Sequence, residues 1–240
     1  MSGGALPKAA PDPPAAAAEV FGTRLPLAQR YAELLATAGV QRGLIGPREV
    51  SRLWERHLLN CAVLGELLDD ATGLIDVGTG AGLPGMVLAV THPELPITLI
   101  EPLARRVVFL EEAAAALGLA NVRISRARAE ELTGTVSAPV VTARAVAPLD
   151  RLARWTMPLV APGGRLLAVN GRSAEEELAT YAPAVRRLGG TGLRVVRCGT
   201  GLVDPPTTVI CVQRAERAGH RPPAPRPAAR QGRRAHGRGR

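Results

Sequence analysis

Aromatic residues are scarce in this chain of 240 residues, which has only two each of Trp, Tyr and Phe. Hydrophobic residues nevertheless make up 46% of the sequence. A core of ordinary size is therefore possible, but it has to be built mainly from Leu, Val, Ile and Ala. The length suits one α/β domain with short additions at either end.

Cysteine and long apolar runs are scarce as well. Cys61, Cys198 and Cys211 are widely spaced and form no C-x-x-C pair, which argues against a disulfide framework and against a zinc site. No segment approaches the roughly 18 apolar residues of a membrane span. The first 18 residues do not follow the signal-peptide pattern, because prolines isolate their short alanine run. We expect a cytoplasmic protein without membrane contacts or a bound metal.

The C-terminal end of the chain has almost no acidic residues. Of the net charge of +9, residues 214–240 contribute nine Arg and one Glu, and residues 1–213 are almost neutral. This tail could screen RNA phosphates, or it could be a solvated extension without function. We predict that it is disordered, as are the Ala-, Pro- and Gly-rich residues 1–20, because neither segment can bury enough apolar surface.

Two helical patterns precede the main domain. Residues 24–38 follow a helical period that stops at Gly39, and a second helix is predicted from about Pro47 to Leu68. We expect residues 21–70 to form a helical extension packed on the core.

From residue 73 to residue 213, short β-runs alternate with helical stretches. The β-runs lie at 74–77, 97–100, 122–124, 140–142 and 165–169, and the helical stretches near 83–91, 103–117, 128–132, 149–159 and 173–188. This alternation predicts a mostly parallel, Rossmann-like sheet over residues 71–213. Two final β-runs, 193–198 and 207–213, have no helix between them and predict an antiparallel edge hairpin.

A glycine-rich turn, Gly78-Thr-Gly80-Ala-Gly82, follows the first of these β-runs. Glycines there permit a sharp turn and let a ligand lie against the main chain. Because Gly80, Gly82 and Gly85 also have the dinucleotide spacing, the turn alone does not identify the ligand.

Carboxylates follow the next two β-runs. Glu101 ends the second run, where it can accept the ribose hydroxyls of an adenosine. Ala129, Glu130 and Glu131 follow the third run and offer an amide and carboxylates for an adenine edge, although acidic residues also suit a first helical turn. We expect S-adenosylmethionine rather than NAD, because no segment after residue 213 could form a dehydrogenase's substrate domain.

Several motifs make the sequence recognisable between about residues 44 and 212. They are Gly46-Pro-Arg-Glu-Val50, Arg56-His-Leu-Leu-Asn60, Asp76-Val-Gly-Thr-Gly-Ala-Gly-Leu-Pro-Gly85, Glu101-Pro102, Arg105-Arg-Val-Val-Phe-Leu110, Arg128-Ala-Glu130, Thr142-Ala-Arg-Ala145 and Pro162-Gly-Gly-Arg-Leu-Leu167. The chain resembles the bacterial 16S rRNA guanine-N7 methyltransferases called ribosomal small subunit methyltransferase G, or glucose-inhibited division protein B. The resemblance implies a class I methyltransferase that modifies one decoding-region guanine, guanine 527 in standard rRNA numbering.

The resemblance also implies roles for individual residues. Gly78, Gly80 and Leu83 would contact the cofactor along the glycine-rich turn, Glu101 would contact the ribose, and Ala129 and Glu130 the adenine. Arg144 would meet the cofactor's carboxylate or the substrate, although it could also be a surface arginine at a helix end. His57 and Asn60 would have a structural or substrate-positioning role.

Guanine N7 carries an exposed lone pair and loses no proton when it is methylated, so positioning can suffice and no general base is required. Asp204-Pro-Pro-Thr207 is interpreted as a tight turn and not as the base-binding motif of amine methyltransferases.

One departure from the family leaves other functions open. Asn170 precedes Gly171 where the family usually has Lys-Gly. The chain could therefore be a catalytically weakened rRNA-binding or assembly protein. Independently of this residue, it could be a methyltransferase of another RNA, a protein or a small molecule. As partners we expect 16S rRNA, the 30S subunit or an assembly intermediate, and as the oligomeric state a monomer.

Overall fold

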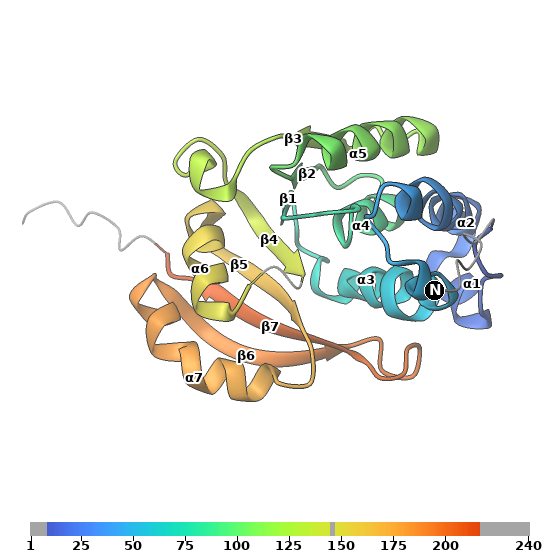
Figure 1. Ribbon diagram of the computed structural model, residues 1–240. Coiled ribbons are helices and arrows are strands. Elements are labelled where there is room, and N and C mark those ends of the chain that lie inside the picture. Colours follow the sequence, from blue (N-terminus) through green and yellow to red (C-terminus); the bar gives the residue numbers. More distant parts are fainter. Residues whose placement is uncertain (1–8, 145–146, 217–240) are drawn as a thin grey trace, which may run out of the picture.

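The sheet has seven strands in the order β3-β2-β1-β4-β5-β7-β6 in the computed structural model, which describes residues 9–144 and 147–216 (Figure 1). The strands are β1 (Leu74–Val77), β2 (Ile97–Ile100), β3 (Val122–Ser125), β4 (Ala138–Arg144), β5 (Val160–Asn170), β6 (Gly190–Cys198) and β7 (Thr207–Arg214). Strands β1 to β5 pair in parallel, and β7 is antiparallel to both β5 and β6. The predicted parallel sheet and C-terminal hairpin are confirmed, with β6 as the edge strand.

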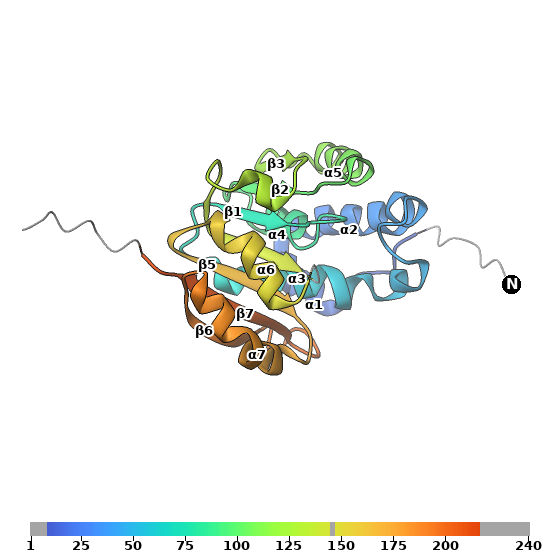
Figure 2. The same ribbon diagram turned by 60° about the vertical axis from the view of Figure 1, so that its left-hand side comes forward.

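Helices cover both faces of the sheet (Figure 2). They are α1 (Ala15–Phe21), α2 (Leu25–Leu34), α3 (Asn60–Ala62), α4 (Gly85–Thr91), α5 (Ala104–Leu117), α6 (Leu149–Thr156) and α7 (Ala174–Arg187). Successive strand residues face opposite cores: Leu74 packs with α1 to α5, whereas Ile75 packs with α6 and α7. Both faces of the sheet are therefore buried, as in other parallel sheets.

The first helix corrects the prediction of disorder for part of residues 1–20, of which residues 1–8 lie outside the described residues. Helix α1 begins within that segment at Ala15, and its Ala17 and Phe21 are buried. Phe21 packs edge-to-face on Trp54, with 6.1 Å between ring centroids, and the Trp54 Nε1–H donates to the carbonyl of Pro11 at 2.8 Å. The alanine- and proline-rich composition contains no sign of this contact, because the partner lies about 40 residues further along the chain.

Short helical turns replace the single helix predicted between residues 47 and 68. They are η3 (Pro47–Arg52, 3-10), η4 (Leu53–Leu59, π), α3 and η5 (Val63–Leu67, 3-10). Similarly, α2 continues through η2 (Leu35–Gly39, π), so Gly39 lies within the helix and does not end it. Further 3-10 turns are η1 (Gly22–Arg24), η6 (Ala129–Leu132) and η7 (Met157–Leu159).

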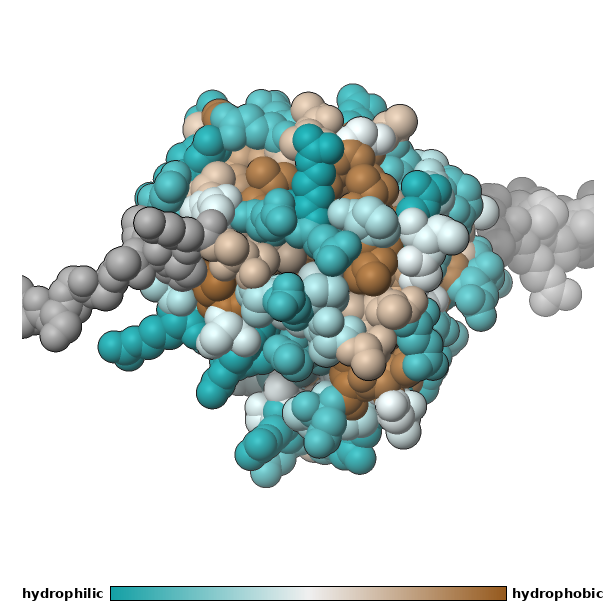
Figure 3. All heavy atoms as spheres, turned by 90° about the vertical axis from the view of Figure 1, so that its right-hand side faces the viewer, coloured by the Kyte–Doolittle hydropathy of each residue, from teal (hydrophilic) through white to brown (hydrophobic). Residues whose placement is uncertain are grey.

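The face formed by the N-terminal helices shows apolar side chains only as separate small areas among hydrophilic ones (Figure 3). The buried residues of these helices belong to the same core cluster as Leu74, Leu99 and Val140 of the sheet. None of the helices in the described part of the chain is both long and apolar enough to span a membrane. The prediction of a disordered arginine-rich tail concerns residues 214–240. Its first residue, Arg214, belongs to β7, which corrects the predicted start of the tail, and residues 217–240 lie outside the described residues.

Candidate functional site

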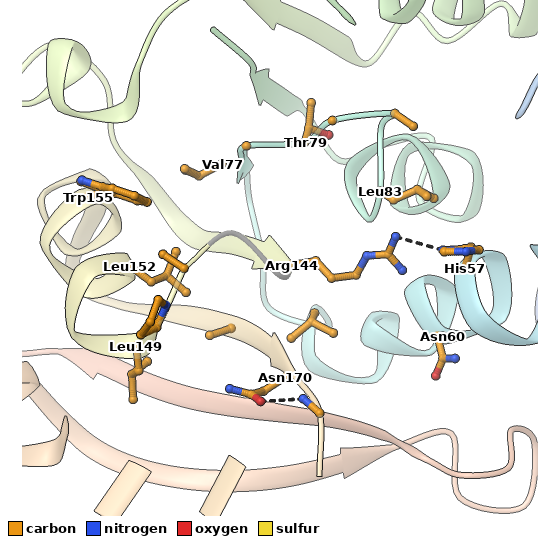
Figure 4. Close-up of a pocket in the computed structure, with 18 of the residues that line it drawn as sticks. His57, Asn60, Val77, Thr79, Leu83, Arg144, Leu149, Leu152, Trp155 and Asn170 are labelled. Carbon is orange, nitrogen blue, oxygen red and sulfur yellow. Dashed lines mark hydrogen bonds between the residues drawn. The ribbon is translucent and has the colours of Figure 1, made fainter. Parts of the chain in front are cut away.

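A cavity of about 1620 Å³ opens at the carboxyl ends of the parallel strands, between the sheet, η4 and α6 (Figure 4). The nine residues given a role by the family resemblance all line it: His57, Asn60, Gly78, Gly80, Leu83, Glu101, Ala129, Glu130 and Arg144. The volume exceeds the roughly 300–1,000 Å³ typical of a small-molecule pocket. It leaves room for a second group beside one nucleotide-sized ligand.

The glycine turn is held by hydrogen bonds to the buried side chain of Asp76, the third residue of β1. Its Oδ2 accepts hydrogen bonds from the Thr79 hydroxyl at 2.5 Å and from the Gly85 amide at 2.9 Å. Its Oδ1 accepts from the Thr142 hydroxyl of β4 at 3.1 Å. Burial raises the pKa of Asp76 to about 6, against the opposing effect of these hydrogen bonds. One carboxyl group therefore joins β1, the turn, α4 and β4.

Close packing around the turn requires glycine at two positions. A Cβ on Gly82, whose φ is +95°, would lie 2.6 Å from the Tyr31 hydroxyl. A Cβ on Gly85 would lie 2.2 Å from Leu99 Cδ2. Tyr31 is fully buried and donates its hydroxyl to the carbonyl of Ala81 at 2.5 Å. Helix α2 of the N-terminal region thus supports the turn directly.

Glu101 is 1% exposed and fixed by main-chain amides. Oε1 accepts from Leu103 N at 3.0 Å, and Oε2 accepts from Gly80 N at 3.1 Å. Arg106 adds a longer contact of 3.4 Å to Oε2. Since a carboxylate oxygen has two acceptor sites, Oε1 keeps one for a ligand hydroxyl. A second hydroxyl could reach Oε2 only in place of Arg106.

The residues after β3 divide into two roles. Glu131 accepts a hydrogen bond from the amide of Arg128 at 2.9 Å, as in a capping box, and does not line the cavity. Ala129 and Glu130 line the cavity. The two interpretations left open from sequence therefore apply to neighbouring residues: Glu131 caps the turn, and Glu130 faces the site.

Arg144 ends β4 and points across the cavity toward His57 (Figure 4). Its NH2 lies 3.1 Å from His57 Nδ1, and its NH1 donates to the carbonyl of Arg56 at 3.3 Å. His57 Nε2 lies 3.2 Å from Glu49 Oε2. Burial and the charge of Arg144 lower the pKa of His57, although Glu49 acts in the opposite direction.

Asn60 links the helical region to the start of β7. The Thr207 hydroxyl contacts both the carbonyl and the side-chain oxygen of Asn60, and the Asn60 amide donates to the carbonyl of Glu55. Asp204, Pro205 and Pro206 lie in the connection between β6 and β7, as predicted, but this connection spans residues 199–206 and is longer than a tight turn. Pro205 also lines the cavity. The reason is that β7 is antiparallel, so it begins at the edge where the parallel strands end.

Asn170, at the end of β5, pairs with α7. Its side-chain amide donates to Glu177 Oε2 at 2.5 Å, and its Oδ1 accepts from the amide of Gly171 at 2.6 Å. Glu177 Oε1 in turn accepts from the amide of Leu149 at 2.6 Å. Asn170 and Glu177 both line the cavity, so a lysine at position 170 would meet a carboxylate there.

Sequence reasoning missed several residues of the site. Glu49 and Asp76 stand in motifs that were recognised, so their positions could have suggested a role. Tyr31 and the cavity-lining Leu152 and Trp155 carry no local signal beyond an apolar helical period. Only their tertiary contacts distinguish them from ordinary core residues.

Solved structures with the same architecture include an S-adenosylmethionine-dependent O-methyltransferase from Thermotoga maritima, with a TM-score of 0.53, 16% identity and coverage of 66% of each chain. The N-methyltransferase NodS from Bradyrhizobium japonicum, in complex with S-adenosyl-L-homocysteine, gives a TM-score of 0.52 at 14% identity, covering 75% of this chain and 98% of NodS. The fold is that of the S-adenosylmethionine-dependent methyltransferases.

Sequence comparison identifies the family. The family model described as rRNA small subunit methyltransferase G matches residues 24–204. A ribosomal RNA small subunit methyltransferase G from Salinispora tropica is 54% identical over 231 residues, covering 93% of this chain and 96% of the relative. One from Streptomyces avermitilis is 56% identical over 210 residues, covering 87% and 88%. The chain belongs to the rRNA small subunit methyltransferase G family, which confirms the resemblance.

Proposed function

We propose that this protein transfers the methyl group of S-adenosylmethionine to N7 of one guanine in the decoding region of 16S rRNA. Family membership over residues 24–204 supports the methyltransferase activity and the rRNA substrate. One structural observation supports the reaction's location: a single cavity joins the glycine turn and Glu101 to Arg144 and an arginine-bearing rim.

The residues of the cavity fit the cofactor's functional groups. Gly78, Gly80 and Leu83 would contact it along the turn, and Glu101 offers a free acceptor site to the ribose. Ala129 and Glu130 would meet the adenine, and Arg144 would pair with the methionine carboxylate. The cofactor supplies an electrophilic methyl group on a sulfonium.

The side chains of the site suit a reaction without proton removal. Both ring nitrogens of His57 are already engaged, by Glu49 and by Arg144, so neither is free to take a substrate proton. Burial raises the pKa of all three cysteines, Cys61, Cys198 and Cys211, and none lines the cavity. A thiolate nucleophile, as carbon-5 pyrimidine methylation requires, is therefore disfavoured. Attack by guanine N7 needs only orientation.

The rim of the cavity suits a polyanionic substrate. Exposed Arg56, Arg128 and Arg172 line it, and they could contact phosphates. We propose that the protein acts in the cytoplasm as a monomer on 16S rRNA, either in the 30S subunit or in an assembly intermediate. Exposed Glu130 and Glu176 also line the cavity, so its rim carries side chains of both charges.

Deletion of the gene tests the proposal. We expect N7-methylguanosine to disappear from one position of 16S rRNA, and the purified protein with S-adenosylmethionine to restore it in rRNA from the deletion strain. Nucleoside mass spectrometry measures the modification. Unchanged N7-methylguanosine at every position in the deletion strain would show that the substrate is a different one.

Asn170→Lys is expected to maintain or raise methyl transfer. The ammonium would replace the Asn170 amide as partner of Glu177, which keeps α7 and β5 joined, and would add a cation to the cavity. Methyl transfer to deletion-strain rRNA measures the effect, with Asn170→Ala as the control that removes the Glu177 partner. A loss in the lysine variant as large as in the alanine variant would show that the cavity depends on asparagine itself.

A further inference from the structure

Glu49 has no assigned role, although it lies in the Gly46–Val50 motif and lines the cavity. It belongs to η3, and its Oε2 lies 3.2 Å from His57 Nε2. The guanidinium of Arg56 also contacts this carboxylate, at 3.3 Å and 3.4 Å to its two oxygens. The Glu49 side chain is one-third exposed, whereas that of His57 is 14% exposed. Glu49 therefore stands between solvent and a largely buried imidazole.

The chemistry of Arg144 determines the protonation of His57. A guanidinium has donors only, so His57 Nδ1, 3.1 Å from Arg144 NH2, must accept this hydrogen bond and carry no proton. The proton of the neutral ring then lies on Nε2, where Glu49 accepts it. The other tautomer would direct an N–H at an N–H and leave Glu49 facing a lone pair.

We propose that Glu49 is a positioning residue: it holds neutral His57 in the Nε2–H tautomer, and His57 together with the Arg56 carbonyl aims the Arg144 guanidinium into the cavity. The proposal rests on the function assigned to Arg144 above, namely binding of the cofactor's carboxylate. It assigns the Gly46–Val50 motif to the same site as the Arg56–Asn60 motif.

Protonation of His57 at acidic pH should break the hydrogen bond between Arg144 and His57. The charged groups that face His57 in the described part of the chain are Glu49 from η3, Arg56 from its own turn and Arg144 from β4. Protonated His57 would carry an N–H on Nδ1, so Arg144 would lose its acceptor and meet a like charge. The pKa of His57 lies below its ordinary value, mainly through burial, so the ring is neutral at pH 7. Cofactor affinity should fall as the pH drops through that pKa.

Two substitutions separate the charge of Glu49 from its hydrogen bond. Glu49→Gln keeps an acceptor for Nε2–H but removes the negative charge that raises the pKa of His57. The acid limit of S-adenosylhomocysteine binding, meaning the pH below which the affinity falls, should therefore move to lower pH. The affinity near pH 8 should stay within about twofold of wild type. Glu49→Ala removes the acceptor of the Nε2–H, so only Arg144 still favours this tautomer and the ring is no longer held from both sides. Affinity near pH 8 should then fall about tenfold, the usual effect of one lost hydrogen bond. Glu55→Gln, an exposed carboxylate of the next turn, is the matched control and should change neither quantity.

Calorimetric titration with S-adenosylhomocysteine between about pH 5 and pH 8 gives the affinities. Long-range ¹H–¹⁵N NMR of the ligand-free protein gives the tautomer and pKa of His57, assigned by the signal that Gln replacement of His57 removes from the four histidines. An Nδ1–H tautomer, or an acid limit that Glu49→Gln leaves in place, would overturn the proposal. The NMR result does not depend on rRNA. If the protein leaves 16S rRNA unmodified, that result would therefore refute the proposed function but not the role of Glu49.

Discussion

Asp76→Ala is expected to lower the free energy of unfolding by about 3 kcal/mol, because it leaves the buried Gly85 amide without an acceptor and removes the partner of two buried hydroxyls. For a chain of this size, that loss corresponds to a fall of roughly 6–12 °C in melting temperature. Thermal denaturation followed by circular dichroism at pH 7 measures it.

Asp76→Asn is the matched control. Its amide oxygen can accept from Thr79 and Gly85, and its NH2 group can donate to the Thr142 hydroxyl, which accepts as readily as it donates. All hydrogen bonds are then kept and a buried charge is removed, so stability at pH 7 should equal or exceed that of wild type. A loss as large as that of the alanine variant would mean that the negative charge itself holds the turn.

The titration of Asp76 should also be visible in the pH dependence of the free energy of unfolding. The pKa of Asp76 in the folded protein is about 6, above the value of about 3.9 for an unfolded aspartate. An acid whose pKa is raised by folding stabilises most when protonated, so its contribution is complete below about pH 4 and is lost as the pH rises through about 6. Wild type should therefore lose up to about 3 kcal/mol relative to Asp76→Asn between these limits. A constant difference between the two proteins would contradict this.

Glu101→Ala is expected to weaken S-adenosylhomocysteine binding by about 10- to 100-fold, the effect of losing a charge-assisted hydrogen bond. The variant removes the proposed ribose acceptor and also leaves the amides of Gly80 and Leu103 without their partner. Isothermal titration calorimetry at neutral pH measures the affinity.

Glu101→Gln should weaken binding as well, although it is nearly isosteric. Each oxygen of Glu101 accepts from a separate main-chain amide, so the NH2 group of glutamine would face an N–H on one side. Glu111→Gln, an exposed position of α5, is the control for loss of one negative charge and should bind as wild type does. Wild-type affinity in both Glu101 variants would place the ribose elsewhere in the cavity.

The sequence alone determined the sheet and one edge of the site. Alternating β-runs and helical stretches predicted parallel strands, and the carboxyl ends of such strands meet at one edge. Gly78, Glu101, Ala129 and Arg144 lie far apart in the chain, but each follows or ends a strand. The sequence pattern therefore places them together at that edge. The C-terminal hairpin followed from the missing helix between its strands.

Only the tertiary structure decided which contacts between the N-terminal helical region and the sheet complete the site. Tyr31 reaches Ala81 across 50 positions, and Arg144 reaches His57 across 87. Periodicity reports whether a residue is buried, but not which distant residue it meets, because that depends on how whole helices pack on the sheet. For the same reason, the composition of residues 1–20 predicts disorder where α1 forms: the buried face of this helix has no partner until Trp54 packs against it.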